Sequence, residues 1–101
     1  MRDFRNPNSL GTHLQGNCSG TSQTLAAIVG ASLNAGTNGV VISANTTARY
    51  TVNGTSPTTT KGHQLRAGQQ LYLTRAEADV VKFCNDADAV GNATLDVSQY
   101  S

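Results

Sequence analysis

Residues 48–73 constrain the fold more than any other part of this chain, because they follow the pattern of a strand, a polar turn and a second strand. Tyr50 and Val52 fall on one face of the first run, with polar residues between them. Asn53 and Gly54, which follow, tolerate the positive φ of a tight turn. This stretch therefore predicts a half-buried β-hairpin.

The rest of the chain repeats this pattern of short apolar runs between turn residues. We expect strands over residues 24–32, 40–46, 49–53, 70–74, 80–85 and 94–100. Residues 25–31 are also compatible with a short buried helical turn, but Ile28, Val29 and Gly30 favour a strand. Residues 75–79 are expected to form a brief helix-like connection. The predicted fold is all-β, a small antiparallel β-sandwich or flattened barrel of about six strands.

The charge of the chain is low and scattered, which bears on its partners. Charged residues make up 13% of 101 residues and the formal net charge is +1. No basic run suggests nucleic acid, so we expect no nucleic-acid partner. No apolar run has the length of a membrane span and the N-terminus lacks a secretory h-region, so we expect no membrane partner and synthesis in the cytoplasm.

The N-terminal residues 1–20 differ from the remainder because their apolar residues follow neither a helical nor a strand period. We expect an extended N-terminal arm over residues 1–20 and a β-sandwich domain over residues 21–101. Isolated apolar residues in such an arm are expected to dock on a neighbouring surface, which suggests an assembly protein. The predicted interface residues of the arm are Arg2, Phe4, Arg5, Leu10 and Leu14.

Side chains that could carry chemistry are few. His13 lies in the arm and His63 in a polar loop, and neither has a local partner for a catalytic triad. Asp86 and Asp88 lack the pattern of a calcium loop and are expected in a solvated turn. We therefore predict no enzyme, no catalytic residue, no cofactor and no metal.

The two cysteines, Cys18 and Cys84, fit no metal-ligand spacing. We expect two free thiols in a buried or half-buried setting. A disulfide that ties the N-terminal segment to the domain is the alternative.

Several segments resemble a family of small structural proteins of tailed bacteriophage particles. The segments that carry the resemblance are Ala48–Thr58, Gly62–Leu65, Ala67–Leu73, Phe83 and Ala93–Tyr100. The resemblance implies a virion protein, most simply a capsid decoration or cement protein that bridges subunits of the major capsid protein on the capsid surface. An exposed strand edge would offer a second route to assembly, with other copies or with a capsid strand, so we also expect a homo-oligomer, a dimer or trimer. A ring component of the neck or tail is an alternative within the same family.

The hairpin alone is also similar to a small β-sandwich module attached to chitobiases and other carbohydrate-active enzymes. A sugar-binding module needs exposed aromatic rings on which sugars can stack. The chain has five aromatic residues, at least two of which are expected in the core: Phe4, Tyr50, Tyr72, Phe83 and Tyr100. Carbohydrate binding is therefore the second alternative function.

Overall fold

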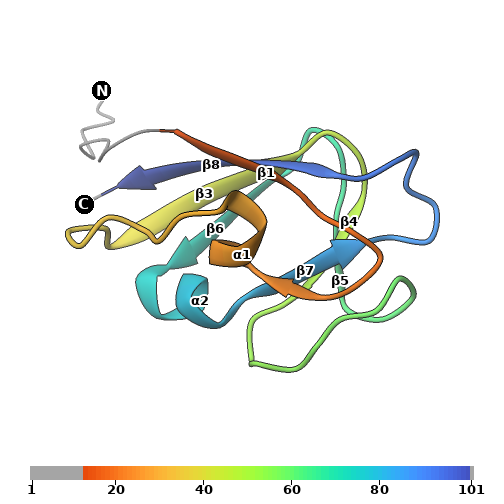
Figure 1. Cartoon of the computed structure of the whole chain (residues 1–101), viewed down its shortest axis with the longest axis horizontal. Coiled ribbons are helices and arrows are strands. Elements are labelled where there is room, and N and C mark those ends of the chain that lie inside the picture. The colour runs from red at the N-terminus through yellow and green to blue at the C-terminus, as the bar shows by residue number, and fades with distance from the viewer. Residues whose placement is uncertain (1–12, 101) are drawn as a thin grey trace.

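The computed structural model describes residues 13–100, and Figure 1 shows the order of their elements. Eight strands and two short helices follow one another along the chain. They are β1 (Leu14–Asn17), β2 (Gln23–Thr24), α1 (Leu25–Val29), β3 (Gly39–Ala44), β4 (Ala48–Thr51), β5 (His63–Leu65), β6 (Gln70–Thr74), α2 (Arg75–Val80), β7 (Lys82–Asn85) and β8 (Thr94–Tyr100). Within these residues no helix has both the length and the apolar character needed to cross a membrane.

The strands form two four-stranded antiparallel sheets, so the fold is mostly β as predicted. The first sheet has the order β1-β8-β3-β6 and the second the order β2-β7-β4-β5. The structure thus has eight strands within residues 13–100, where about six were expected over the whole chain. The three without a predicted counterpart are the short edge strands β1, β2 and β5. The predicted hairpin over residues 48–73 is wrong in its second strand, because β4 pairs with β5 whereas β6 lies in the other sheet.

Alternating burial in the first sheet explains why its strands were predictable. Strand β3 alternates half-buried and buried residues along its whole length, and β8 does the same. Strands β6 and β8 have the predicted bounds, residues 70–74 and 94–100. The buried alternate residues point to one side, and the other side of the sheet faces solvent.

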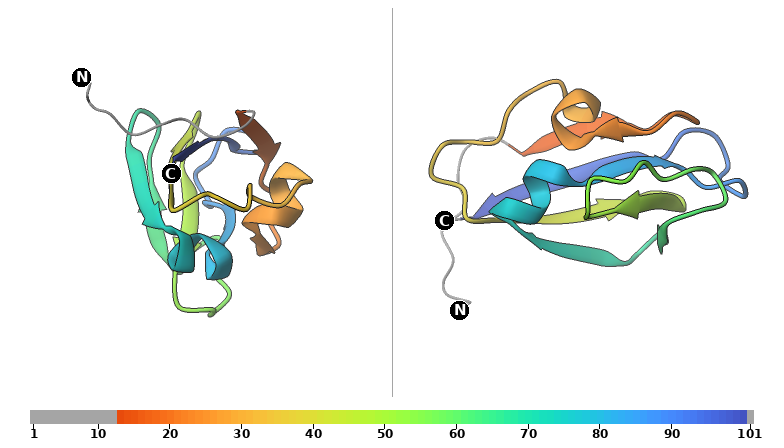
Figure 2. Two further views of the ribbon diagram at one scale, coloured as in Figure 1. Left: turned by 90° about the vertical axis from the view of Figure 1, so that its left-hand side faces the viewer. Right: turned by 90° about the horizontal axis from the view of Figure 1, so that it is seen from below.

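One hydrophobic core joins the two sheets. The first sheet contributes Ile42, Leu95 and Val97, all fully buried, and the second contributes Phe83 and Leu65. Figure 2 shows the two sheets as layers, with α1 and α2 near their edges.

Helix α1 replaces the strand that we expected over residues 24–32, so that prediction is wrong. The Thr24 side chain accepts a hydrogen bond from the Ala27 backbone N–H and caps the first turn. Gly30 ends the helix with a φ of 72°. Leu25 and Ile28, three residues apart, are the two buried residues, which is the spacing of one helical face.

Residues 14–17, which the sequence assigned to the arm, form strand β1 and pair with β8. Leu14 lies opposite Val97, is half-buried and packs against the core. Residues 14–17 of the predicted arm therefore belong to the first sheet. Arg2, Phe4, Arg5 and Leu10 lie outside the described residues.

Candidate binding surface

The outward side of the first sheet, here called the outer face, is formed by all four of its strands. Its residues alternate with those of the core, so they come from every second position of the four strands. Residues that pair across the strands form three rows: Tyr72, Val41 and Ser98; Thr74, Gly39 and Tyr100; and Gln70, Ser43, Asp96 and Gln15. Most of these side chains carry hydroxyl or amide groups.

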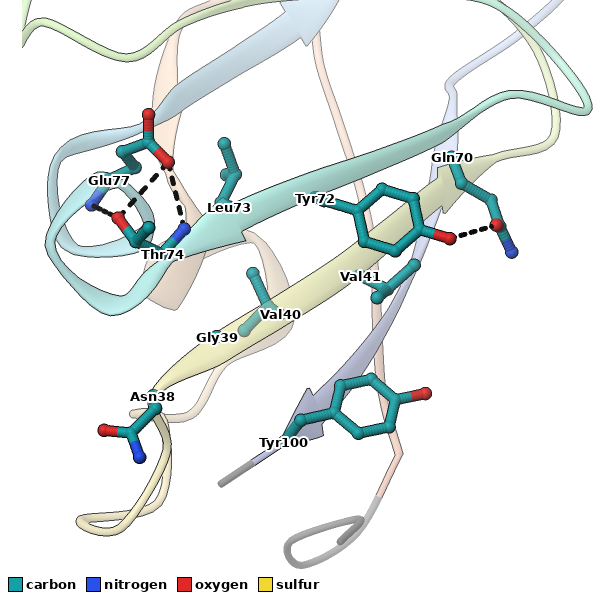
Figure 3. Close-up of a pocket in the computed structure, with 10 residues that line it drawn as sticks. All are labelled: Asn38, Gly39, Val40, Val41, Gln70, Tyr72, Leu73, Thr74, Glu77 and Tyr100. Atoms are coloured by element: carbon teal, nitrogen blue, oxygen red, sulfur yellow. Dashed lines mark hydrogen bonds between the residues drawn. The ribbon is translucent and has the colours of Figure 1, made fainter. Parts of the chain in front are cut away.

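An open groove runs along the β6 side of the outer face (Figure 3). Its volume of 610 Å³ falls within the range of ligand sites, about 300–1,000 Å³. The lining residues are Asn38, Gly39, Val40, Val41, Gln70, Tyr72, Leu73, Thr74, Glu77 and Tyr100.

Two tyrosines border the groove. Tyr72 is 69% exposed, which is unusual for a large aromatic side chain, and its hydroxyl donates to Gln70 Oε1 at 2.9 Å. Tyr100 is half-buried on the opposite side, and Val41 lies between the two strands that carry the tyrosines. The groove thus offers aromatic faces beside an amide.

Gly39 leaves the floor of the groove open. It lies between Thr74 of β6 and Tyr100 of β8, and it contributes no side chain to the outer face. A Cβ at this position would lie 3.2 Å from the Leu73 carbonyl oxygen, closer than ordinary van der Waals contact. The hollow beside Tyr100 therefore depends on glycine.

A capping box fixes the end of the groove where β6 leads into α2. Thr74 Oγ1 accepts from the Glu77 backbone N–H at 3.2 Å, and Glu77 Oε1 accepts from the Thr74 N–H at 3.0 Å. Glu77 lies within the helix-like connection that the sequence predicts over residues 75–79. Its carboxylate holds the first turn of α2.

The segment that leads into β3 is held by buried polar contacts beneath the groove. Gln99 is 2% exposed, and its Oε1 accepts from the Asn34 N–H at 2.7 Å and from the Thr37 hydroxyl at 2.8 Å. Arg75 donates to the carbonyls of Asn34 and Thr37. These bonds place Asn38 at the mouth of the groove.

The groove is a mostly uncharged surface. Among the described residues that line it, Glu77 is the one charged group, and its Oε1 already accepts bonds from Thr74. Elsewhere in residues 13–100, no three His, Cys, Asp or Glu side chains gather as metal ligands would. The groove can offer aromatic faces, hydroxyls and amides to a partner.

Asp86, expected in a solvated turn, is buried at 4% exposure, and that expectation is wrong. Its carboxylate accepts from Arg49 Nε at 2.5 Å, Gln64 Nε2 at 3.2 Å and the Asp88 N–H at 2.9 Å. The Asp88 N–H bond, together with the bonds from Arg49 and Gln64, outweighs burial and lowers the pKa of Asp86. This buried ion pair ties β4, β5 and the loop after β7 together, away from the groove.

The two histidines lie apart. His13 Nε2 lies 3.2 Å from Asp96 Oδ1 at the exposed β1 side of the outer face. His63 belongs to β5, and its ring centroid lies 5.4 Å from that of Tyr50. Neither histidine lines the groove.

Cys18 and Cys84 are free and buried, as expected. Burial, with a smaller contribution from the nearby Cys84, raises the pKa of Cys18 to about 12. The pKa of Cys84 is also raised, mainly by burial. Both groups therefore remain thiols at neutral pH.

Of the five residues predicted as arm anchors, Leu14 is described, and it lies on the core side of β1 rather than in the groove. The alternation of Leu71, Tyr72 and Leu73 is the signal for the groove in the sequence. Leu71 and Leu73 face inward, so Tyr72 between them must face solvent.

Comparison with known proteins identifies no family for this chain, because no family model, no curated protein and no solved structure matches it.

Proposed function

We propose that the protein is a non-enzymatic structural component of a bacteriophage particle, a decoration or cement protein that bridges major capsid protein subunits on the outside of the shell. In this proposal the chain is a small antiparallel β-sandwich with an extended N-terminal arm. The observation that carries the proposal is the outer face, with its open, mostly uncharged groove and an exposed tyrosine.

The chemistry of the outer face favours a protein partner. Hydroxyl and amide groups cost less to desolvate than charges do, so such a face can be buried against a shell. Exposed tyrosine is enriched at protein interfaces, because its ring packs while its hydroxyl bonds. Many copies on a symmetric shell add avidity to individually weak contacts.

Co-sedimentation with expanded capsids stripped of the protein tests this function. We expect saturable binding with a fixed number of copies per shell. Absence of binding, with a stable ring in solution by mass measurement, would contradict the decoration role and favour a neck or tail ring.

The arm is tested in the same assay by exchanging its apolar anchors. Phe4→Ser with Leu10→Ser is expected to weaken shell binding by at least about tenfold, because both anchors lose apolar contact area. The matched control, Arg2→Gln with Arg5→Gln, separates apolar from charged contributions. Unchanged binding in both variants would remove the arm from the proposal. Leu14 is left intact, because it packs against the core.

Carbohydrate binding is the second candidate, and the exposure of Tyr72 favours it. A sugar ring can stack on an aromatic face while neighbouring amides bond its hydroxyls. Retarded migration in polysaccharide gels, lost in Tyr72→Ala and kept in Val90→Ala, would support this function. Val90 is the control because it is also an exposed apolar residue, at 89%.

A further inference from the structure

Strand β6 is an edge of the first sheet, and nothing described lies beyond it. It pairs with β3 on one side, and both views of Figure 2 show it at the border of the molecule. Within residues 13–100, no backbone hydrogen bond from a turn, loop or cap reaches Gln70 or Tyr72. Such an edge is a template for another strand.

The register shows which backbone groups of β6 are free. The backbone N–H of Asn45, one residue after β3, donates to the Thr94 carbonyl of β8. Successive residues of a strand bond to opposite sides, so the odd-numbered residues of β3 bond to β8 and the even-numbered residues bond to β6. The Arg75 N–H bond to the Asn38 carbonyl at 2.8 Å follows the same alternation.

It follows that Leu71 and Leu73 bond to β3, whereas the N–H and C=O groups of Gln70, Tyr72 and Thr74 point away. The Thr74 N–H is already taken by Glu77 Oε1. Among residues 13–100, the backbone N–H and C=O groups of Gln70 and Tyr72 thus have no partner.

The β6 edge also lacks the features that usually protect an edge strand. Its five residues include no charge and no proline, and its pairing with β3 is continuous. The other edge strands are shorter: β1 has four residues, β5 three and β2 two.

We propose that β6 pairs antiparallel with β6 of a second copy of this chain, with Gln70 opposite Tyr72 of the other copy. A two-fold axis at Leu71 brings the same donors and acceptors together from both copies, so every free group of Gln70 and Tyr72 gains a partner. The register that pairs Tyr72 with itself would place Gln70 opposite Thr74, whose N–H is occupied.

Side chains suit this pairing. Tyr72 would pack beside Gln70 of the other copy on the outer face, which matches the bond that the two residues already make within one chain. The half-buried Leu71 residues would meet at the axis and cover each other's exposed part. The two grooves would then join into one continuous surface. This dimer does not depend on the proposed function.

Sedimentation velocity from about 1 µM to about 1 mM tests the dimer, since an interface this small is expected to be weak. Tyr72→Lys should weaken self-association by about tenfold or more, because it removes the ring and adds like charges near the axis. Val90→Lys is the matched control, with the same charge change at another exposed apolar residue. It should leave self-association unchanged.

Cross-linking tests the register. Leu71→Cys residues would face each other in a non-hydrogen-bonded pair, with Cα atoms about 4.5 Å apart, within disulfide range. Tyr72→Cys residues would be two positions out of line and should not cross-link. The native cysteines are buried, so the unmodified chain should not cross-link either.

Each of the other outcomes overturns the proposal. A monomer at every concentration removes the dimer and leaves the edge for a different partner. A dimer that Tyr72→Lys does not weaken uses another surface, and cross-linking of Tyr72→Cys in place of Leu71→Cys shows another register.

Discussion

Gly16 lies where helix α1 contacts strand β1. A Cβ built there would lie 2.0 Å from the Ile28 carbonyl oxygen and 2.9 Å from the Val29 Cα. Both contacts are with backbone, so neither can be relieved by a side-chain rotation. The approach of the helix to the sheet therefore requires glycine for space rather than for its dihedral angles, because the φ of Gly16 is not positive.

We expect Gly16→Ala to destabilise the protein by about 2–3 kcal/mol, because the helix must move to admit the methyl group. Urea unfolding measures this difference. Gly20→Ala is the matched control, because a Cβ there meets nothing within 4 Å. A loss of the same size in Gly20→Ala would refute the steric explanation.

Asp86 stabilises the fold through its ion pair with Arg49. The side chains of Asp86 and Arg49 are 2% and 20% exposed. We expect Asp86→Asn to cost about 2–3 kcal/mol at pH 7, near the lower end for a broken buried pair, since Arg49 keeps some contact with water. Asp88→Asn is the control, because Asp88 is exposed and only its backbone N–H contributes.

The lowered pKa of Asp86 makes this contribution depend on pH. Its folded pKa lies below the ordinary value of 3.8, so the unfolded chain takes up a proton first as the pH falls. The stabilisation is complete above about pH 5 and is lost as the pH falls through 3.8 toward the folded pKa. Urea midpoints from pH 7 to pH 3 should show a steeper decline in the native chain than in Asp86→Asn, and parallel curves would contradict the assignment.

At the scale of elements, the two helices each begin at a threonine that caps them. Thr24 and Thr74 both have extended backbone and accept a bond from the third helical residue. The Thr-x-x-Glu spacing of Thr74 and Glu77 is a capping-box signature visible in the sequence. Thr24 has no such glutamate, and the β-branched Ile28 and Val29 favoured a strand by propensity. Packing of Leu25 and Ile28 into the core decides in favour of the helix.

Removing the cap of α2 should loosen one end of the groove. We expect Thr74→Ala to cost about 1 kcal/mol of stability, and Thr74→Ser to restore most of it because serine keeps the hydroxyl acceptor. Urea unfolding compares the three chains. If Thr74→Ser is as unstable as Thr74→Ala, the hydroxyl bond to the Glu77 N–H is not the cause.

The strands that the sequence revealed are those with one face in the core. Leu95 and Val97 alternate with polar residues, and the bounds of β8 followed directly. Strand β1 escaped prediction because Gly16 interrupts its apolar pattern and its partner β8 is far away in sequence. The burial of Asp86 could not be predicted either, because Arg49 and Gln64 reach it from strands that only the tertiary fold brings near.

For the molecule as a whole, the two thiols report on unfolding. Cys18 hydrogen-bonds through its backbone N–H to the Ala93 carbonyl, and it is as deeply buried as Cys84. We expect neither to react with a thiol reagent in the native state at pH 8, because both are buried and Cys18 has a pKa of about 12. Both should become labelled in urea, with a transition that coincides with loss of circular dichroism. Labelling that precedes this transition would indicate local opening.

The order of strands in the first sheet has a consequence for synthesis. Strand β1 is translated before the other strands, yet its partner is β8, so Leu14 cannot pair with Val97 until nearly the whole chain has been made. At a translation rate of about 5–20 residues per second, this wait is on the order of ten seconds. In the last part of that time, once Thr74 has been added and before β8 is made, the nascent chain holds β3 and β6 as a two-stranded piece whose apolar side is uncovered. This is the period when a ribosome-associated chaperone would have most to protect.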